Sequence, residues 1–86
     1  MMVQIMYFGR PSDFLLMTSE RLDIADETCS LEQVLNRLRK RGEKWAYELA
    51  DCHVVCTINQ DYAELTTMLE DRDEIGIFSR KPCYEI

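Results

Sequence analysis

One amphipathic segment between two groups of alternating residues limits the fold of this chain more than any other feature. Ser30 and Gln33 form a capping-box pattern. In this pattern the Ser side chain accepts a hydrogen bond from the backbone N–H of the Gln, and the Gln side chain accepts one from the backbone N–H of the Ser. Apolar residues then recur at the spacing of one helix face, at Leu31, Val34, Leu35 and Leu38. A single apolar stripe has to be buried against another element, so we expect this helix to cover a sheet.

The segments before this helix predict two strands. Residues 3–9 show the two-residue side-chain alternation that is typical of a strand, and residues 17–24 show the same alternation. Between them, residues 9–13 are of types that favour a turn, and Pro11 prevents the first strand from continuing as a central strand. The two strands are therefore expected to form a hairpin with a loop near Arg10–Phe14.

The half of the chain after the main helix is expected to hold mostly strands and turns. A short helix at 43–50 places Trp45 and Leu49 four residues apart, and Trp45 is interpreted as a core aromatic rather than a binding residue. The other expected elements are a strand at 53–59, a turn at 59–61, a short strand near Ala63–Thr66, a polar turn at 70–73 and a last strand at 74–78.

This order of elements predicts an α+β protein. One main helix is expected to pack across one face of a mixed sheet of four to five strands, with the first and last strands parallel at its centre. A second short helix completes the set of elements. That arrangement is a β-grasp, or ubiquitin-like, fold. With 86 residues the chain is expected to form one domain, at 1–78, followed by an extended C-terminal tail at 79–86.

Composition and charge exclude several classes of partner. The chain has 16 acidic and 10 basic residues and a net charge of −6, which argues against binding to nucleic acid or to a membrane surface. Its longest apolar run, 14–17, is far too short to span a bilayer. The basic run Arg37–Lys44 is interpreted as a solvated helix face, although it also resembles a docking patch for an acidic partner or RNA. The start has no secretory pattern, so we expect a cytoplasmic protein.

Two clusters of ligand-type residues are candidates for metal binding. Cys52, His53 and Cys56 lie close together, but the chain has one His and no second pair at a zinc spacing. Small thiols on a strand are the favoured interpretation. The acids Glu70, Asp71, Asp73 and Glu74 lack the spacing of a calcium loop and are interpreted as a solvated turn. We therefore expect no metal, no cofactor and no catalytic residue.

Several segments, taken in order, resemble the small sulfur-carrier subunit of molybdopterin synthase, the MoaD family. They are the opening strand VQIMYFG, the helix SLEQVLNRL, the segment KWAYEL, the strand and turn TINQ, and the stretch LEDRDEIGIF at 69–78. The last is similar to the family pattern L-x-D-G-D-E-V-x-F-F, with Arg72 in place of the usual Gly. The resemblance covers most of the chain.

The resemblance implies a carrier rather than an enzyme. In the family, an ATP-dependent activating enzyme adenylates the terminal carboxylate, and sulfur transfer converts it into a thiocarboxylate. The tail then enters the active site of the large synthase subunit and donates sulfur to the pterin precursor of molybdenum cofactor. The implied partners of this chain are therefore the molybdopterin synthase large subunit and the activating enzyme.

The tail is where this sequence departs from the family. The expected partner-binding residues are Phe78, Arg80, Lys81, Pro82, Cys83, Tyr84, Glu85 and Ile86, and no terminal Gly-Gly is among them. Glycine suits a narrow tunnel because it lacks a Cβ and adopts most backbone conformations. Two alternatives follow: an interaction or regulatory module of ubiquitin type that has lost carrier chemistry, or a carrier that holds sulfur as a persulfide on Cys83.

Overall fold

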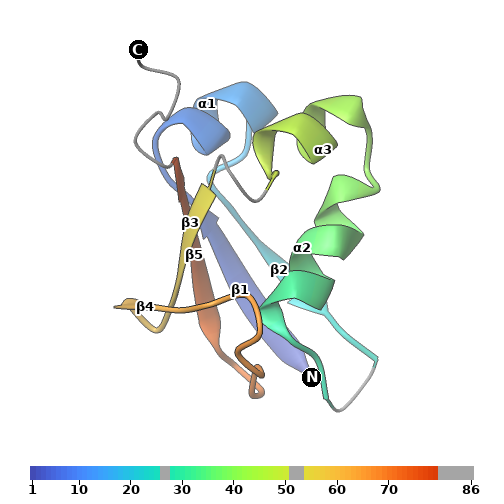
Figure 1. Cartoon of the computed structure of the whole chain (residues 1–86), viewed down its shortest axis with the longest axis vertical. Coiled ribbons are helices and arrows are strands. Elements are labelled where there is room, and N and C mark those ends of the chain that lie inside the picture. Colours follow the sequence, from blue (N-terminus) through green and yellow to red (C-terminus); the bar gives the residue numbers. More distant parts are fainter. Residues whose placement is uncertain (26–27, 51–53, 80–86) are drawn as a thin grey trace.

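A five-stranded sheet in the order β2-β1-β5-β3-β4 forms the framework of the protein (Figure 1). The computed structural model describes residues 1–25, 28–50 and 54–79. The elements, in chain order, are β1 (Met2–Tyr7), α1 (Arg10–Leu15), β2 (Ser19–Asp23), α2 (Leu31–Arg39), α3 (Glu43–Glu48), β3 (Val54–Ile58), β4 (Asp61–Tyr62) and β5 (Glu74–Ser79).

The two central strands come from opposite ends of the chain. β1 and β5 pair in parallel, with Ile5 opposite Ile75, whereas β2 and β3 pair with them antiparallel on either side. A parallel pair needs a long crossover connection, and here α2, α3 and β3 all lie within it. The predicted α+β class, the parallel central pair and the ubiquitin-like arrangement are confirmed.

Helix α2 forms as its sequence predicts. The Ser30 Oγ accepts a hydrogen bond from the Gln33 backbone N at 3.3 Å, and the Ser30 backbone N donates to Gln33 Oε1 at 2.8 Å. The whole apolar stripe of the helix, from Leu31 to Leu38, is buried in the core. Figure 1 shows α2 and α3 on one side of the sheet, so this side carries the core.

Alternation along the strands gives the sheet two different faces. On β1, the side chains of Val3, Ile5 and Tyr7 are buried under the helices. The even-numbered residues of this strand, such as Gln4 and Met6, point to the opposite side. We call the side under the helices the inner face and the other side the outer face.

The turn predicted at residues 9–13 is wrong, because helix α1 begins at Arg10. Pro11 occupies the first turn of α1, where a helix does not need its missing N–H, and its side chain is fully buried. The helix ends at Leu15, and the next residue, Leu16, has a left-handed φ of 56°. Proline was interpreted as a strand breaker, although it is equally a helix starter.

The strand expected at Ala63–Thr66 is also wrong. Asn59 and Gln60 both have positive φ, and this tight two-residue turn sets Asp61 directly opposite Ile58. The returning strand β4 is therefore only two residues long. Beyond it, the Ala63 backbone N donates to the Cys56 carbonyl at 3.1 Å, and the chain then leaves β3.

Candidate docking surface

The outer face carries a stacked pair of aromatic side chains. Phe8 and Phe78 lie with ring centroids 4.6 Å apart and ring planes 11° from parallel. Phe8 follows the end of β1, and Phe78 lies on β5, one residue before that strand ends. They remain 39% and 37% exposed, a large fraction for apolar side chains that touch each other. Exposed aromatic pairs of this kind are typical of protein interaction sites.

A hollow lies beside this pair because residue 76 has no side chain. A Cβ on Gly76 would lie 2.5 Å from Thr57 Oγ1 and 3.1 Å from the Phe78 ring. Gly76 itself is buried beneath these side chains and borders an open cavity of about 220 Å³. Its walls are Met6, Phe8, Thr57, Gln60, Glu74 and Phe78.

A row of cross-strand partners extends this surface over β1, β5, β3 and β4. Met6 faces Gly76, Gly76 faces Thr57, and Thr57 faces Tyr62 in the strand registers. Cross-strand partners lie on the same face of a sheet, so all four belong to the outer face. Tyr62 at the end of the row is 85% exposed. We define the docking surface as Phe8, Phe78, Tyr62 and the hollow over Gly76.

Of the residues expected in the partner-binding tail, the structure describes Phe78. It lies on this candidate surface, and its role at an interface stays a prediction. The others, Arg80 to Ile86, lie outside the described residues. Sequence reasoning missed Phe8, Gly76 and Tyr62, although the two-residue period of β1 and β5 already places Phe8 and Gly76 on the same side as Phe78.

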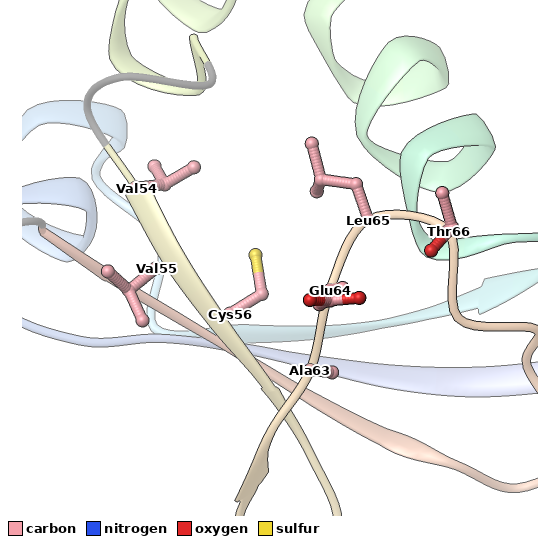
Figure 2. A pocket seen from close by; sticks show the side chains of 7 residues that line it. All are labelled: Val54, Val55, Cys56, Ala63, Glu64, Leu65 and Thr66. Atoms are coloured by element: carbon pink, nitrogen blue, oxygen red, sulfur yellow. The ribbon is translucent and has the colours of Figure 1, made fainter.

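A second pocket lies at the edge of β3 (Figure 2). It has a volume of about 460 Å³ and is bounded by Val54, Val55 and Cys56 of β3 and by segment 63–66. Figure 2 shows Val54 and Cys56 pointing to one side of the strand and Val55 to the other. The Cys56 thiol is buried, as expected of a small thiol on a strand. The other members of its cluster, Cys52 and His53, lie outside the described residues.

No metal-binding cluster of three or more His, Cys, Asp or Glu side chains occurs within the described ranges. The acidic turn before β5 is held by hydrogen bonds instead. The Asp73 carboxylate is 8% exposed and accepts from Asn59 Nδ2 at 3.0 Å and from the Glu70 backbone N at 2.8 Å. Asp71 Oδ1 accepts from the Met2 backbone N at 2.8 Å. Two of these acids therefore fasten the turn to its neighbours.

A polar cluster missed by sequence reasoning fastens the helices to the sheet. The Glu20 carboxylate on β2 accepts from both Nη atoms of Arg41, at 2.7 and 2.8 Å, and from the Tyr7 hydroxyl at 2.6 Å. The Arg41 guanidinium lies 4.6 Å from the centroid of the Trp45 ring, and Tyr7 meets that ring edge-on at 6.0 Å. Trp45 thus packs against the core as predicted.

Burial and hydrogen bonding shift the ionisation of this cluster. Burial, and then the hydrogen bond to Glu20, raise the pKa of the Tyr7 hydroxyl. Partial burial alone would raise the pKa of Glu20, but hydrogen bonds from Arg41 and Tyr7 outweigh it and lower that pKa. The hydrogen bond to Glu20 raises the pKa of Arg41. All three shifts favour an ionised pair with a neutral tyrosine.

None of the helices that the structure describes is long and apolar enough to cross a membrane. A mixed five-stranded sheet with a parallel central pair and helices on one face defines a ubiquitin-like β-grasp protein. Within this class the chain belongs to the ThiS family, whose model matches residues 5–79.

Known proteins that resemble the chain agree with this assignment. It is 26% identical over 77 residues to the molybdopterin synthase sulfur carrier subunit of Haemophilus influenzae, covering 90% of this chain and 93% of that protein. A putative molybdopterin converting factor subunit 1 from Pyrococcus furiosus superposes with a TM-score of 0.75 at 23% identity, covering 91% and 95% of the two chains.

A solved protein–protein complex also contains a similar chain. The complex joins subunits 1 and 2 of the molybdopterin-converting factor from Helicobacter pylori. The match has a TM-score of 0.67 at 18% identity and covers 95% of this chain and 97% of that one. At this identity the likeness establishes a shared fold.

Proposed function

We propose that this protein is the sulfur-carrier subunit of a molybdopterin synthase and acts in molybdenum cofactor biosynthesis. The observation that carries the proposal is the match to the Haemophilus influenzae sulfur carrier subunit along nearly the whole length of both chains. Membership of the ThiS family supports it. In this role the protein supplies no catalytic side chain and is a substrate that its partners load and unload.

The docking surface binds the large subunit of the synthase. Phe78 lies one residue before the end of β5, and the chain continues from Ser79 into Arg80–Ile86. A partner that holds Phe8 and Phe78 is therefore next to the point where the tail begins. The tail then enters the active site of the large subunit while the folded domain stays outside.

The proposed chemistry takes place at the terminal carboxyl group. An activating enzyme joins the carboxylate to AMP from ATP and releases pyrophosphate. Sulfide-level sulfur, supplied as hydrosulfide, then attacks the acyl carbon and displaces AMP, so that a C–S bond replaces a C–O bond and a thiocarboxylate forms. In the large subunit, the thiocarboxylate sulfur bonds to the pterin precursor. Water then cleaves the acyl C–S bond, which leaves the sulfur on the pterin and returns the carboxylate for another cycle.

Intact-mass measurement tests the carrier role. The full chain is incubated with the activating enzyme, ATP and a sulfur donor, and the same mixture without ATP is the control. A carrier gains the mass difference between one sulfur and one oxygen atom at its C-terminus. No mass change, with binding to the large subunit retained, would contradict the proposal and favour the ubiquitin-type interaction module.

The same measurement distinguishes the persulfide alternative on Cys83. A persulfide keeps every oxygen and adds a whole sulfur atom, so its mass gain is larger than that of a thiocarboxylate. The variant Cys83→Ser loses a persulfide completely but leaves a thiocarboxylate unchanged. We expect the smaller mass gain in both the natural chain and this variant.

A further inference from the structure

The hollow over Gly76 has a charged group at its rim as well as aromatic walls. Glu74, the first residue of β5, lines it on one side and the Gln60 amide lines it on another. The Phe8 and Phe78 rings form an apolar wall. A site with an apolar wall and a carboxylate at its rim suits a side chain with a long apolar stem and a cationic end.

The Glu74 carboxylate is available for such a contact. Its backbone is held, because its N–H donates to Asn59 Oδ1 at 3.0 Å and its carbonyl accepts from the Asn59 backbone N at 2.8 Å. Within residues 1–25, 28–50 and 54–79, no hydrogen bond or ion pair engages the carboxylate itself. The backbone that carries this side chain is therefore held in place, and the carboxylate is open to a partner.

We propose that this hollow binds one arginine side chain of a basic partner surface. The methylene stem lies against the Phe8 and Phe78 rings, and the guanidinium meets the Glu74 carboxylate and the Gln60 amide oxygen. Arginine fits better than lysine because its planar guanidinium forms a paired hydrogen bond with a carboxylate, whereas the lysine ammonium is a point charge. The net charge of −6 also favours approach of a basic surface.

Gly76 makes this contact possible. A side chain at this position would push aside Thr57 Oγ1, which lies 2.5 Å from a Cβ, and the Phe78 ring at 3.1 Å, and so would disturb the aromatic wall that the arginine stem contacts. The inference rests on the docking surface of the proposed function, but on neither the tail nor the sulfur chemistry.

A small-molecule titration tests this assignment without any partner protein. The full chain labelled with ¹⁵N is titrated with n-butylguanidinium, which imitates the arginine side chain, and in parallel with 1-pentanol as a neutral probe of similar length. We expect saturable shifts of the Thr57, Gly76 and Phe78 amide signals with the guanidinium, and weaker ones with the alcohol.

Two variants separate the charge from the cavity. Glu74→Gln keeps the shape of the rim, and we expect it to weaken n-butylguanidinium binding about three- to fivefold, as loss of a half-exposed charge pair does. Glu64→Gln removes an exposed carboxylate outside the hollow and should change nothing. The spectra themselves report whether each variant is folded.

Two results would overturn the inference. If 1-pentanol shifts the same signals as strongly as n-butylguanidinium, the hollow is an apolar site only. If Glu74→Gln binds the guanidinium as well as the natural chain does, the carboxylate is not a partner. Both results leave the mass test of the carrier role unaffected, so failure of one proposal is distinguishable from failure of the other.

Discussion

The inner and outer faces of the sheet are built from the same strands and from alternate residues of each strand. On the inner face, residues such as Ile5 and Ile77 are completely buried in the core. On the outer face, Phe8, Phe78 and Tyr62 keep large parts of their side chains exposed. Apolar area that stays in water contributes little to folding, so its concentration on one face indicates a second use for it.

With the proposed function, the comparison assigns folding to the inner face and binding to the outer face. Substitutions on the inner face should lower stability, and those on the outer face should lower affinity with little loss of stability. This division also explains Gly76, which weakens a central strand and yet opens the hollow.

The largest expected effect is a loss of stability when a core residue of the inner face is truncated. Leu35 has no exposed surface, and Leu35→Ala should lower the free energy of unfolding by about 2–5 kcal/mol through lost burial and a new cavity. Tyr62→Ala on the outer face should change it by less than about 0.5 kcal/mol. Urea denaturation followed by circular dichroism measures both. Equal losses in the two variants would break the comparison.

The next effect concerns the polar cluster that joins the helices to the inner face. Glu20→Gln keeps the shape of the side chain but removes its charge, and its unfolding free energy should fall by about 1–2 kcal/mol. The Glu20 side chain is 16% exposed and receives hydrogen bonds from both Tyr7 and Arg41. Glu64→Gln, an exposed carboxylate, is the matched control and should leave stability unchanged.

The Glu20 carboxylate should also make the free energy of unfolding depend on pH. The pKa of Glu20 is lower in the folded protein than its ordinary value of 4.5. Its contribution to stability is therefore complete above that value and is lost as the pH falls through the folded-state pKa. Between neutral pH and acid, the natural chain should lose more stability than Glu20→Gln does. Parallel stability curves for the two proteins would show that the carboxylate is not responsible.

The smallest effect lies in a turn that belongs to neither face. Arg72 has a φ of 73°, in the left-handed region that favours glycine, and its only described ion pair is a 3.9 Å contact with Asp71 at the surface. Arg72→Gly should raise the unfolding free energy by about 0.5–1 kcal/mol by relieving this strain. A loss of stability in thermal or urea unfolding would mean that the Arg72 side chain supports the fold.

Most of the fold could be predicted from the sequence because its signals are local. The α2 stripe and capping box, and the alternation of β1 and β5, depend on residues a few positions apart. The two errors arose where one residue type serves two structures. Pro11 starts a helix as readily as it stops a strand, and the left-handed Asn59 and Gln60 shortened the turn and moved the return strand.

The candidate site was less predictable because it depends on contacts between distant segments. Phe78 was identified from its position before the tail, whereas its stacking partner Phe8 lies at the other end of the chain. The ion pair between Glu20 and Arg41 likewise forms only when β2 and the connection between α2 and α3 lie close together in the folded chain. Neither pair leaves a pattern at a fixed spacing in the sequence.

The central claim is that the outer face binds the large synthase subunit, and the affinity of Phe78→Ala for that subunit tests it most directly. Isothermal titration calorimetry compares it with the natural chain and with Met68→Ala, which removes an exposed apolar side chain beside Ser30 at the start of α2. We predict that Phe78→Ala raises Kd at least about tenfold and Met68→Ala leaves it unchanged. A folded Phe78→Ala protein that binds as tightly as the natural chain would contradict the account.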